Sequence, residues 1–172
     1  ELHPSDGEAI GLNDADIATL STKQGEMQAR VVLTKRQRAG SVFVPMHFTD
    51  RFASNGRVDA LTHSLVDPFS AQPAFKSTAV AVMKFPAKWY GFAAIAEGIF
   101  ENLVIPSGAS YWAKARVNSG VRIELAGGSI PDCWTTFLKE LMGPLENIEI
   151  LEMVSPVTGQ THVAGFQSGK LI

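Results

Sequence analysis

The stretch that decides how this sequence is interpreted is residues 59–76, DALTHSLVDPFSAQPAFK. It ends a long segment, residues 46–75, that has neither the helical nor the strand spacing of apolar residues. Long segments without regular structure in compact domains are usually functional or disordered. Phe48, Phe52 and Phe69 favour an ordered loop that faces a ligand, and aromatic residues that pin a structural loop are a comparable explanation.

Strand patterns flank this loop on both sides. Apolar and polar residues alternate in residues 27–33, which together with residues 16–21 and a glycine turn between them predict a β-hairpin. Residues 42–44 continue the β pattern until Pro45, which has no backbone N–H to donate. After the loop, residues 78–84 return to a strand pattern.

The sequence changes character at Phe85-Pro86, which predicts two domains, residues 1–84 and 85–172. Apolar residues recur every three or four positions after Asp132, as one face of a helix requires. Strands are expected around this helix, at residues 89–92, 111–113, 121–125, 148–154 and 161–166. The second domain is therefore expected to be a small α+β domain with the order β-β-β-α-β-β. Its last residues resemble a turn and the start of one more strand, so we interpret both ends of the sequence as cuts in a longer polypeptide.

Charge and cysteine content exclude several classes of function. Fifteen Lys+Arg and 17 Asp+Glu give a formal net charge of −2, so no overall field draws the chain to nucleic acid or to an anionic membrane. The apolar stretches are far shorter than the ~20 residues of a membrane helix. A single cysteine, Cys133, excludes a disulfide framework or a cysteine-rich metal site within this chain, and it fits a reducing, cytoplasmic compartment. The four histidines show no metal-ligand spacing, so no metal site is expected.

The order of the motifs resembles a known family. His3-Pro4-Ser5-Asp6, Gly25, GSVFVPMH at residues 40–47 and the motifs within residues 59–76 follow one another as in the C-terminal molybdopterin-dinucleotide-binding domain of the dimethyl-sulfoxide-reductase family. The family pattern is roughly HPxDA, a glycine hairpin, PGxVFxPxH, NxLT and DPxSxQPEFK, followed by a strand. The resemblance implies a mainly β protein with α/β elements: a six-stranded double-psi β-barrel, lacking its first strand, followed by the small α+β domain.

The resemblance also implies a cofactor, molybdopterin guanine dinucleotide, two copies of which hold molybdenum in the full enzyme. An aromatic ring followed by a lysine offers a flat surface for a ring system and a charge for phosphate. Neutral polar groups near them can fix the orientation of a large polar ligand. This chain departs from the family at Asp59, where Asn is common, and at Ala74, where Glu is common. The predicted cofactor-binding residues are His47, Asp59, Leu61, Thr62, Gln72, Phe75 and Lys76.

Residues 85–172 indicate which enzymes within this family the sequence resembles. Residues 89–92, 111–116 and 122–127 are similar to the segment after the barrel in bacterial assimilatory nitrate reductases. This implies reduction of nitrate to nitrite, with electrons from an electron-donor protein or domain. The molybdenum-ligating cysteine and an iron–sulfur cluster would belong to preceding domains of the same polypeptide. No catalytic residue is therefore expected in this chain, and the chain alone is expected to be inactive.

Two other functions are compatible with the same residues. One is a noncatalytic psi-barrel module that binds a partner protein, and the other is an enzyme of the same family with a different substrate, such as formate. The loop from His47 to Lys76 distinguishes the first of these, because only the enzyme requires it to line a cofactor.

Overall fold

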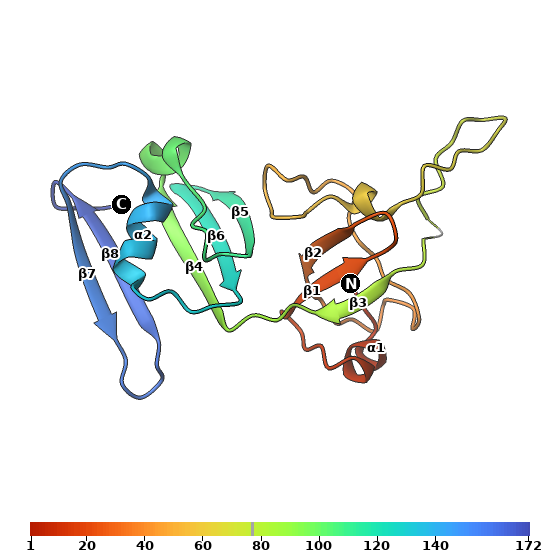
Figure 1. Cartoon of the computed structure of the whole chain (residues 1–172), viewed down its shortest axis with the longest axis horizontal. Helices are drawn as coiled ribbons and strands as arrows, with labels where there is room; N and C mark the ends of the chain where they lie inside the picture. The colour runs from red at the N-terminus through yellow and green to blue at the C-terminus, as the bar shows by residue number, and fades with distance from the viewer. Residues whose placement is uncertain (77) are drawn as a thin grey trace. The chain divides into compact units, whose positions relative to one another are not determined.

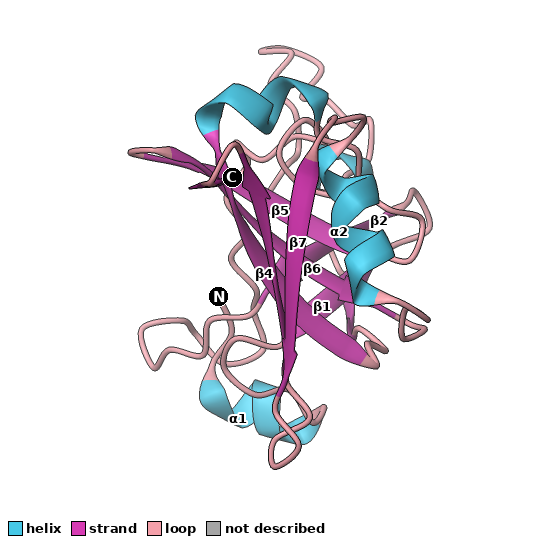
Figure 2. Cartoon of the chain, turned by 90° about the vertical axis from the view of Figure 1, so that its left-hand side faces the viewer, coloured by secondary structure: helices cyan, strands magenta, loops and turns pink. Residues whose placement is uncertain are grey.

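The computed structural model describes residues 1–76 and 78–172, except for the side chains of residues 100–102. The chain divides into two compact units, Glu1–Pro86 and Ala87–Ile172 (Figure 1). Each unit has a hydrophobic core made from its own residues. Strands outnumber helices (Figure 2), so the prediction of a mainly β protein is confirmed. None of the helices in these residues is long and apolar enough to cross a membrane.

The first unit is built on a three-stranded antiparallel sheet with the order β2-β1-β3. The central strand β1 (Ile17–Ser21) pairs with its sequence neighbour β2 (Glu26–Arg30) and with the distant β3 (Ala81–Lys84). A helix, α1 (Pro4–Ala9), and a 3-10 helix, η1 (Val58–Leu61), complete its regular elements. Its buried apolar side chains form one cluster that consists of Leu2, Leu12, Ala18, Leu20, Met27, Val31 and Leu61.

This sheet is open, whereas the resemblance implies a closed six-stranded barrel. The sequence predicts that residues 42–44 continue the β structure. This prediction is wrong, because these residues, which the structure describes, form no strand. Phe43 instead exchanges two backbone hydrogen bonds with Glu1, donating its N–H at 3.1 Å and accepting at 2.7 Å. Strand β3 begins later than predicted, because β1 ends at Ser21, the partner of Ala81. Alternation of apolar residues indicates a strand, but the partner strand decides how far the hydrogen-bonded ladder extends.

The second unit contains two three-stranded antiparallel sheets and one helix. Its elements are, in chain order, β4 (Trp89–Ala96), the 3-10 helix η2 (Glu97–Asn102), β5 (Tyr111–Val117), β6 (Gly120–Gly127), α2 (Trp134–Met142), β7 (Ile148–Val154), β8 (Thr161–Gln167) and β9 (Lys170–Leu171). The strands and α2 follow one another in the order β-β-β-α-β-β, with β9 as a further short strand. The sheets have the orders β4-β6-β5 and β7-β8-β9.

Helix α2 forms where the apolar spacing predicts it, and that spacing also explains its packing. Leu141 and Met142 are almost fully buried in the core of the second unit. At the other end of the helix, the Trp89 ring packs edge to face against Trp134 and Phe137, with centroids 5.1 and 5.3 Å apart. Edge-to-face aromatic pairs stabilise a core beyond the area that they bury. The helix is therefore held to strand β4 by its aromatic N-terminal half.

Because the two cores share no residue, a cavity in one unit should destabilise that unit and not the other. Ile123 on β6 is fully buried, so Ile123→Ala should cost about 2 to 5 kcal/mol in the second unit. Hydrogen exchange measured by mass spectrometry should show faster exchange in residues 87–172 and unchanged exchange in residues 1–86. Phe92→Ala, at a side chain on the same sheet that is 80% exposed, is the control. Equal loss of protection in both units would contradict two separate cores.

An ion pair at the end of the first sheet predicts a pH dependence. Desolvation favours the neutral form of Asp16, but hydrogen bonds from the Lys84 ammonium and the Asn13 N–H, both at 2.8 Å, outweigh it and lower the pKa of this carboxyl. A lowered pKa adds stability that is complete above the ordinary carboxyl pKa and is lost as the pH falls through the lowered value.

Asp16→Asn should therefore reduce the free energy of unfolding at neutral pH by less than about 1 kcal/mol, since Lys84 is partly exposed. In urea titrations the difference from the unsubstituted chain should begin to shrink as the pH falls below the ordinary carboxyl pKa of about 3.9, and it should vanish below the lowered pKa of Asp16. Glu8→Gln, at an exposed position of α1, is the control. If the free energy of unfolding of Asp16→Asn remains equally reduced in acid, the loss of stability would come from packing instead of charge.

Candidate functional site

A pocket of about 530 Å³ lies in the first unit beside the turn that joins β1 to β2. The turn supplies one wall, His63 supplies a second, and the chain that leads into β3 supplies a third. All of its walls belong to the first unit. The lining residues are Ser21, Thr22, Lys23, Gln24, His63, Ala79 and Ala81.

Thr22 fixes the shape of the β1–β2 turn. Its N–H donates to the Gly25 carbonyl at 2.9 Å, and its hydroxyl accepts from the Gln24 N–H at 3.1 Å. The same hydroxyl donates to the carbonyl of Leu61 at 3.1 Å. The turn is therefore tied to the end of η1 by a hydrogen bond between residues distant in sequence.

Gly25 allows this turn and η1 to approach each other closely. A Cβ atom at Gly25 would lie 2.9 Å from the carbonyl oxygen of Ala60, closer than real Cβ atoms come to backbone. The absence of a side chain at Gly25 is what brings the turn against η1.

His63 is oriented by a second contact from the same turn. The Gln24 side-chain Nε2 lies 2.9 Å from His63 Nδ1. An amide nitrogen can only donate, so Nδ1 is the acceptor and the ring proton of neutral His63 is on Nε2. Nε2–H of this lining residue is then a donor for a ligand.

Three of the predicted cofactor-binding residues lie at or next to η1, beside the pocket. Asp59 is exposed, and its carbonyl accepts from both the N–H and the hydroxyl of Thr62, at 3.1 and 2.9 Å. Leu61 is 2% exposed and belongs to the core, so its side chain cannot contact a ligand without rearrangement. Thr62 immediately precedes His63 and leads into the pocket wall.

The other predicted residues lie on two exposed segments. Gln72 and Phe75 belong to an arm, residues 65–75, that extends away from the sheet of the first unit (Figure 1). Lys76 follows the arm and is exposed. His47 lies in a separate exposed turn and is not part of the pocket lining. None of the seven predicted residues lines the pocket. Asp59, Leu61 and Thr62 precede the lining residue His63 in the chain, and the other four lie on exposed segments.

The arm has a well-defined tip. The Asp67 carboxylate accepts from the N–H groups of Ser70 and Phe69, at 2.8 and 3.0 Å, and from the Ser70 hydroxyl at 3.0 Å. These hydrogen bonds, those from Ser70 foremost, lower the pKa of Asp67. Backbone bonds from Asp67 to Gln72 and from Ala74 to Leu65 close the stem, at 2.9 and 3.0 Å. The arm is therefore a hydrogen-bonded hairpin, and its Phe69 side chain is 98% exposed.

Sequence reasoning missed the side chains that line the pocket. The sequence predicts a glycine turn after residue 21 and gives no ligand role to Lys23, Gln24 or His63. The available signal was their position, since His63 directly follows the Asp59–Thr62 motif and Lys23 precedes the hairpin glycine. The sequence alone does not show that these two places meet.

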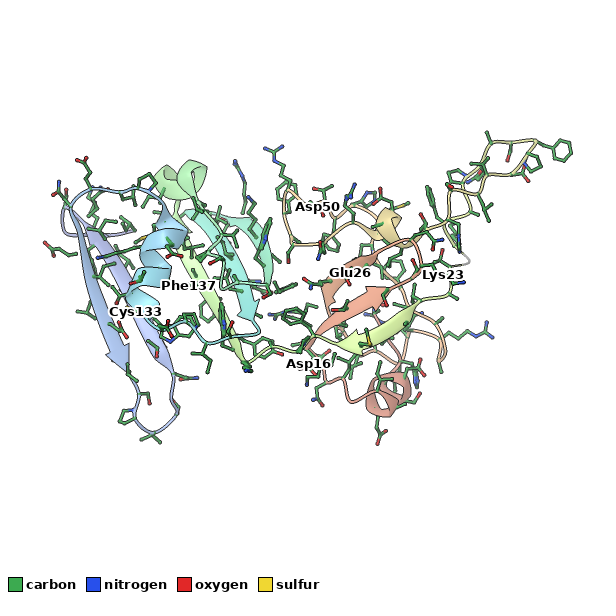
Figure 3. The ribbon with its side chains drawn as sticks, viewed as in Figure 1. Asp16, Lys23, Glu26, Asp50, Cys133 and Phe137 are labelled. Carbon is green, nitrogen blue, oxygen red and sulfur yellow. The ribbon has the colours of Figure 1, made fainter. Side chains whose placement is uncertain are left out.

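Cys133 lies in the second unit, exposed at the N-cap of α2 (Figure 3). Hydrogen bonding to Thr136 lowers the pKa of its thiol. Within residues 1–76 and 78–172, no group of three or more His, Cys, Asp or Glu side chains is placed to hold a metal ion.

Residues 1–79 match a protein family described as "Molydopterin dinucleotide binding domain". The matched segment includes all seven predicted ligand residues and most of the pocket lining. This segment is a molybdopterin dinucleotide binding domain. The family therefore confirms the predicted class of cofactor, a molybdopterin dinucleotide.

The molybdopterin dinucleotide binding domain and the residues after it are similar to parts of larger enzymes. A nitrate reductase of Klebsiella oxytoca is 33% identical over 135 residues, which is 78% of this chain and 15% of that protein. A nitrate reductase of Synechocystis is 36% identical over 61 residues, 36% of this chain and 8% of that protein. The alpha subunit of a formate dehydrogenase from Methanococcus maripaludis is 32% identical over 84 residues, 49% of this chain and 12% of that protein.

The chain thus spans 15% or less of the length of these relatives. No solved structure gives a significant match. A match of 135 residues is longer than the first unit, Glu1–Pro86, so the similarity to the Klebsiella enzyme includes part of the second unit.

The close approach at Gly25 predicts a strong effect of a single methyl group. Gly25→Ala places Cβ against a backbone atom, so the turn or η1 must move, at about 1 to 3 kcal/mol. The melting temperature should fall, and amide signals of residues 58–63 should shift in NMR spectra. Gly98→Ala, where a Cβ meets no atom within 4 Å, is the control. An unchanged melting temperature and unshifted signals would show that η1 does not depend on this contact.

Proposed function

We propose that this chain is part of a molybdenum oxidoreductase and that its first unit holds molybdopterin guanine dinucleotide. The observation that carries the proposal is that residues 1–79 form a molybdopterin dinucleotide binding domain. Its geometry supports the same conclusion, because two predicted ligand segments, residues 59–62 and 72–76, precede in the chain residues that line one pocket, His63 and Ala79.

The residues around this pocket have the chemistry that such a cofactor requires. The Thr62 hydroxyl and the exposed Gln72 amide offer hydrogen bonds for a polar ring system. Phe75 offers a half-exposed ring for stacking, and Lys76 offers a positive charge for phosphate. The exposed Asp59 carboxylate can accept N–H groups of guanine or pterin, and His47 would contact the cofactor from its own turn. When bound, the cofactor supplies the two-electron redox chemistry, while these residues bind and orient it.

Nitrate is the proposed substrate. The similarity to a nitrate reductase extends beyond the first unit, whereas the match to a formate dehydrogenase covers 84 residues and is no longer than that unit. Reduction of nitrate to nitrite consumes two electrons and two protons and releases water. We propose that preceding domains of the same polypeptide bind the substrate, that a donor protein or domain supplies the electrons, and that the enzyme works in cytoplasmic nitrate assimilation.

Oxidation of formate is the second candidate, favoured by the 32% identity to a formate dehydrogenase subunit. The full-length enzyme that contains this chain should reduce nitrate with an artificial electron donor and should not oxidise formate with an artificial acceptor. Formate oxidation without nitrate reduction would replace nitrate as the substrate and leave the cofactor assignment intact.

Lys76→Ala tests the cofactor assignment in the full-length enzyme. A lysine that contacts a phosphate contributes about 1.5 to 3 kcal/mol, so cofactor affinity should fall about ten- to a hundredfold. Molybdenum content per protein should drop, whereas nitrite production per retained molybdenum should change much less, because the lysine binds the cofactor and not the substrate. Lys35→Ala, at an exposed lysine of the first unit outside the pocket lining, is the control. Full molybdenum content in Lys76→Ala would remove this residue from the site.

Asp59→Asn tests the departure from the family pattern. If the Asp59 carboxylate accepts N–H groups of guanine or pterin, the substitution replaces an acceptor with a donor and lowers molybdenum content. If Asp59 lies beside phosphate, the substitution removes a repulsive charge and content is retained or rises. The thermal unfolding curve should be unchanged in either case, because the side chain is exposed.

A further inference from the structure

We propose that the pocket at the β1–β2 turn is a phosphate-binding site, with Lys23 as its cationic ligand and His63 and Gln24 as neutral donors. If the proposed function holds, on which this identification of the ligand rests, the anion is the pyrophosphate of the dinucleotide. None of these three residues was among the predicted ligands.

The charge of the pocket lining favours an anion. Lys23 is its charged member, and none of the lining residues is acidic. Figure 3 shows Lys23 in the turn between β1 and β2, and Glu26 on the following strand. Glu26 is paired in register with Ser21 but does not line the pocket. Among the described residues Lys23 forms no ion pair, so its charge is available to a ligand.

The neutral groups of the lining are held so that they donate. Gln24 uses one amide hydrogen on His63 Nδ1 at 2.9 Å and keeps the other, and His63 keeps Nε2–H. Ser21 adds a hydroxyl from the end of β1. A lysine among several N–H and O–H donors, without a carboxylate, is the composition that suits phosphate oxygens, since charge-assisted hydrogen bonds are the stronger ones.

The walls of the pocket are already formed without a ligand. Thr22 hydrogen-bonds to Leu61, and Gly25 packs against Ala60, so the turn and η1 are joined before binding. Preorganised donors lose little conformational entropy on binding. The volume of about 530 Å³ exceeds the need of a diphosphate and lies within the range of ligand pockets, so a neighbouring part of a nucleotide also has room.

The position of the pocket agrees with the proposed cofactor path. His63 follows Thr62 directly, and Ala79 lies shortly after Lys76 in the chain. Each predicted ligand segment is therefore followed in the chain by a different wall of the pocket.

Titration of the 172-residue chain with inorganic pyrophosphate, followed by NMR, tests this proposal. Pyrophosphate should shift the amide signals of residues 22–25 and 63. Its affinity should fall about tenfold or more in Lys23→Gln, remain near the original value in Lys23→Arg, and be unchanged in the control Lys35→Gln. Melting curves should coincide, because Lys23 and Lys35 are both exposed.

Three results would overturn the phosphate site. The first is equal weakening in Lys23→Gln and Lys35→Gln, which would indicate a general surface charge effect. The second is the absence of shifts at residues 22–25 and 63. The third is an equally strong shift of these signals by guanosine, which has no phosphate and would place the base there instead.

Cofactor content of the full-length enzyme separates this proposal from the proposed function. A dinucleotide content that falls in Lys23→Gln supports both. A content that falls in Lys76→Ala but not in Lys23→Gln overturns the phosphate site and leaves the proposed function intact. A purified enzyme that contains no pterin dinucleotide overturns the proposed function, and the pyrophosphate titration then decides the phosphate site by itself.

Discussion

The contact on which the site of the first unit depends is the packing of the β1–β2 turn against η1. Gly25 has no Cβ, so the turn reaches the carbonyl of Ala60, and the Thr22 hydroxyl then donates to Leu61 at 3.1 Å. This contact joins a hairpin near the start of the chain to a helix that follows a long irregular segment. Because Leu61 is also part of the core, the turn is anchored to the same cluster that supports the sheet. The pocket lies beside this contact and takes its geometry from it.

A second constraint acts on the arm at residues 65–75. The three hydrogen bonds accepted by Asp67 hold its tip in one conformation, although the arm carries little buried apolar surface. Local polar contacts can therefore order a segment that hydrophobic burial does not. An ordered arm presents Gln72 and Phe75 at lower entropic expense than a flexible loop would.

The second unit has its own core and is included in the similarity to a relative. Its core of aromatic and aliphatic side chains consists of residues of the second unit alone. The similarity to the Klebsiella nitrate reductase nevertheless continues into it. The similarity thus includes both units, whereas the match to the molybdopterin dinucleotide binding domain covers residues 1–79.

The sequence by itself determined the mainly β class, the order of elements in the second unit, the helix α2 and the cofactor family. The first three follow from hydrophobic periods, which are properties of neighbouring residues, and the cofactor family follows from the resemblance of the motifs and their order to a known family. It did not determine the extent of β3, the absence of a strand at residues 42–44, or the burial of Leu61, because each depends on a partner distant in the chain. Only the tertiary structure brought Lys23, Gln24 and His63 into one pocket. The reason is physical: a hydrogen bond from Gln24 to His63 and a glycine contact to Ala60 join segments whose separation along the chain carries no local signal.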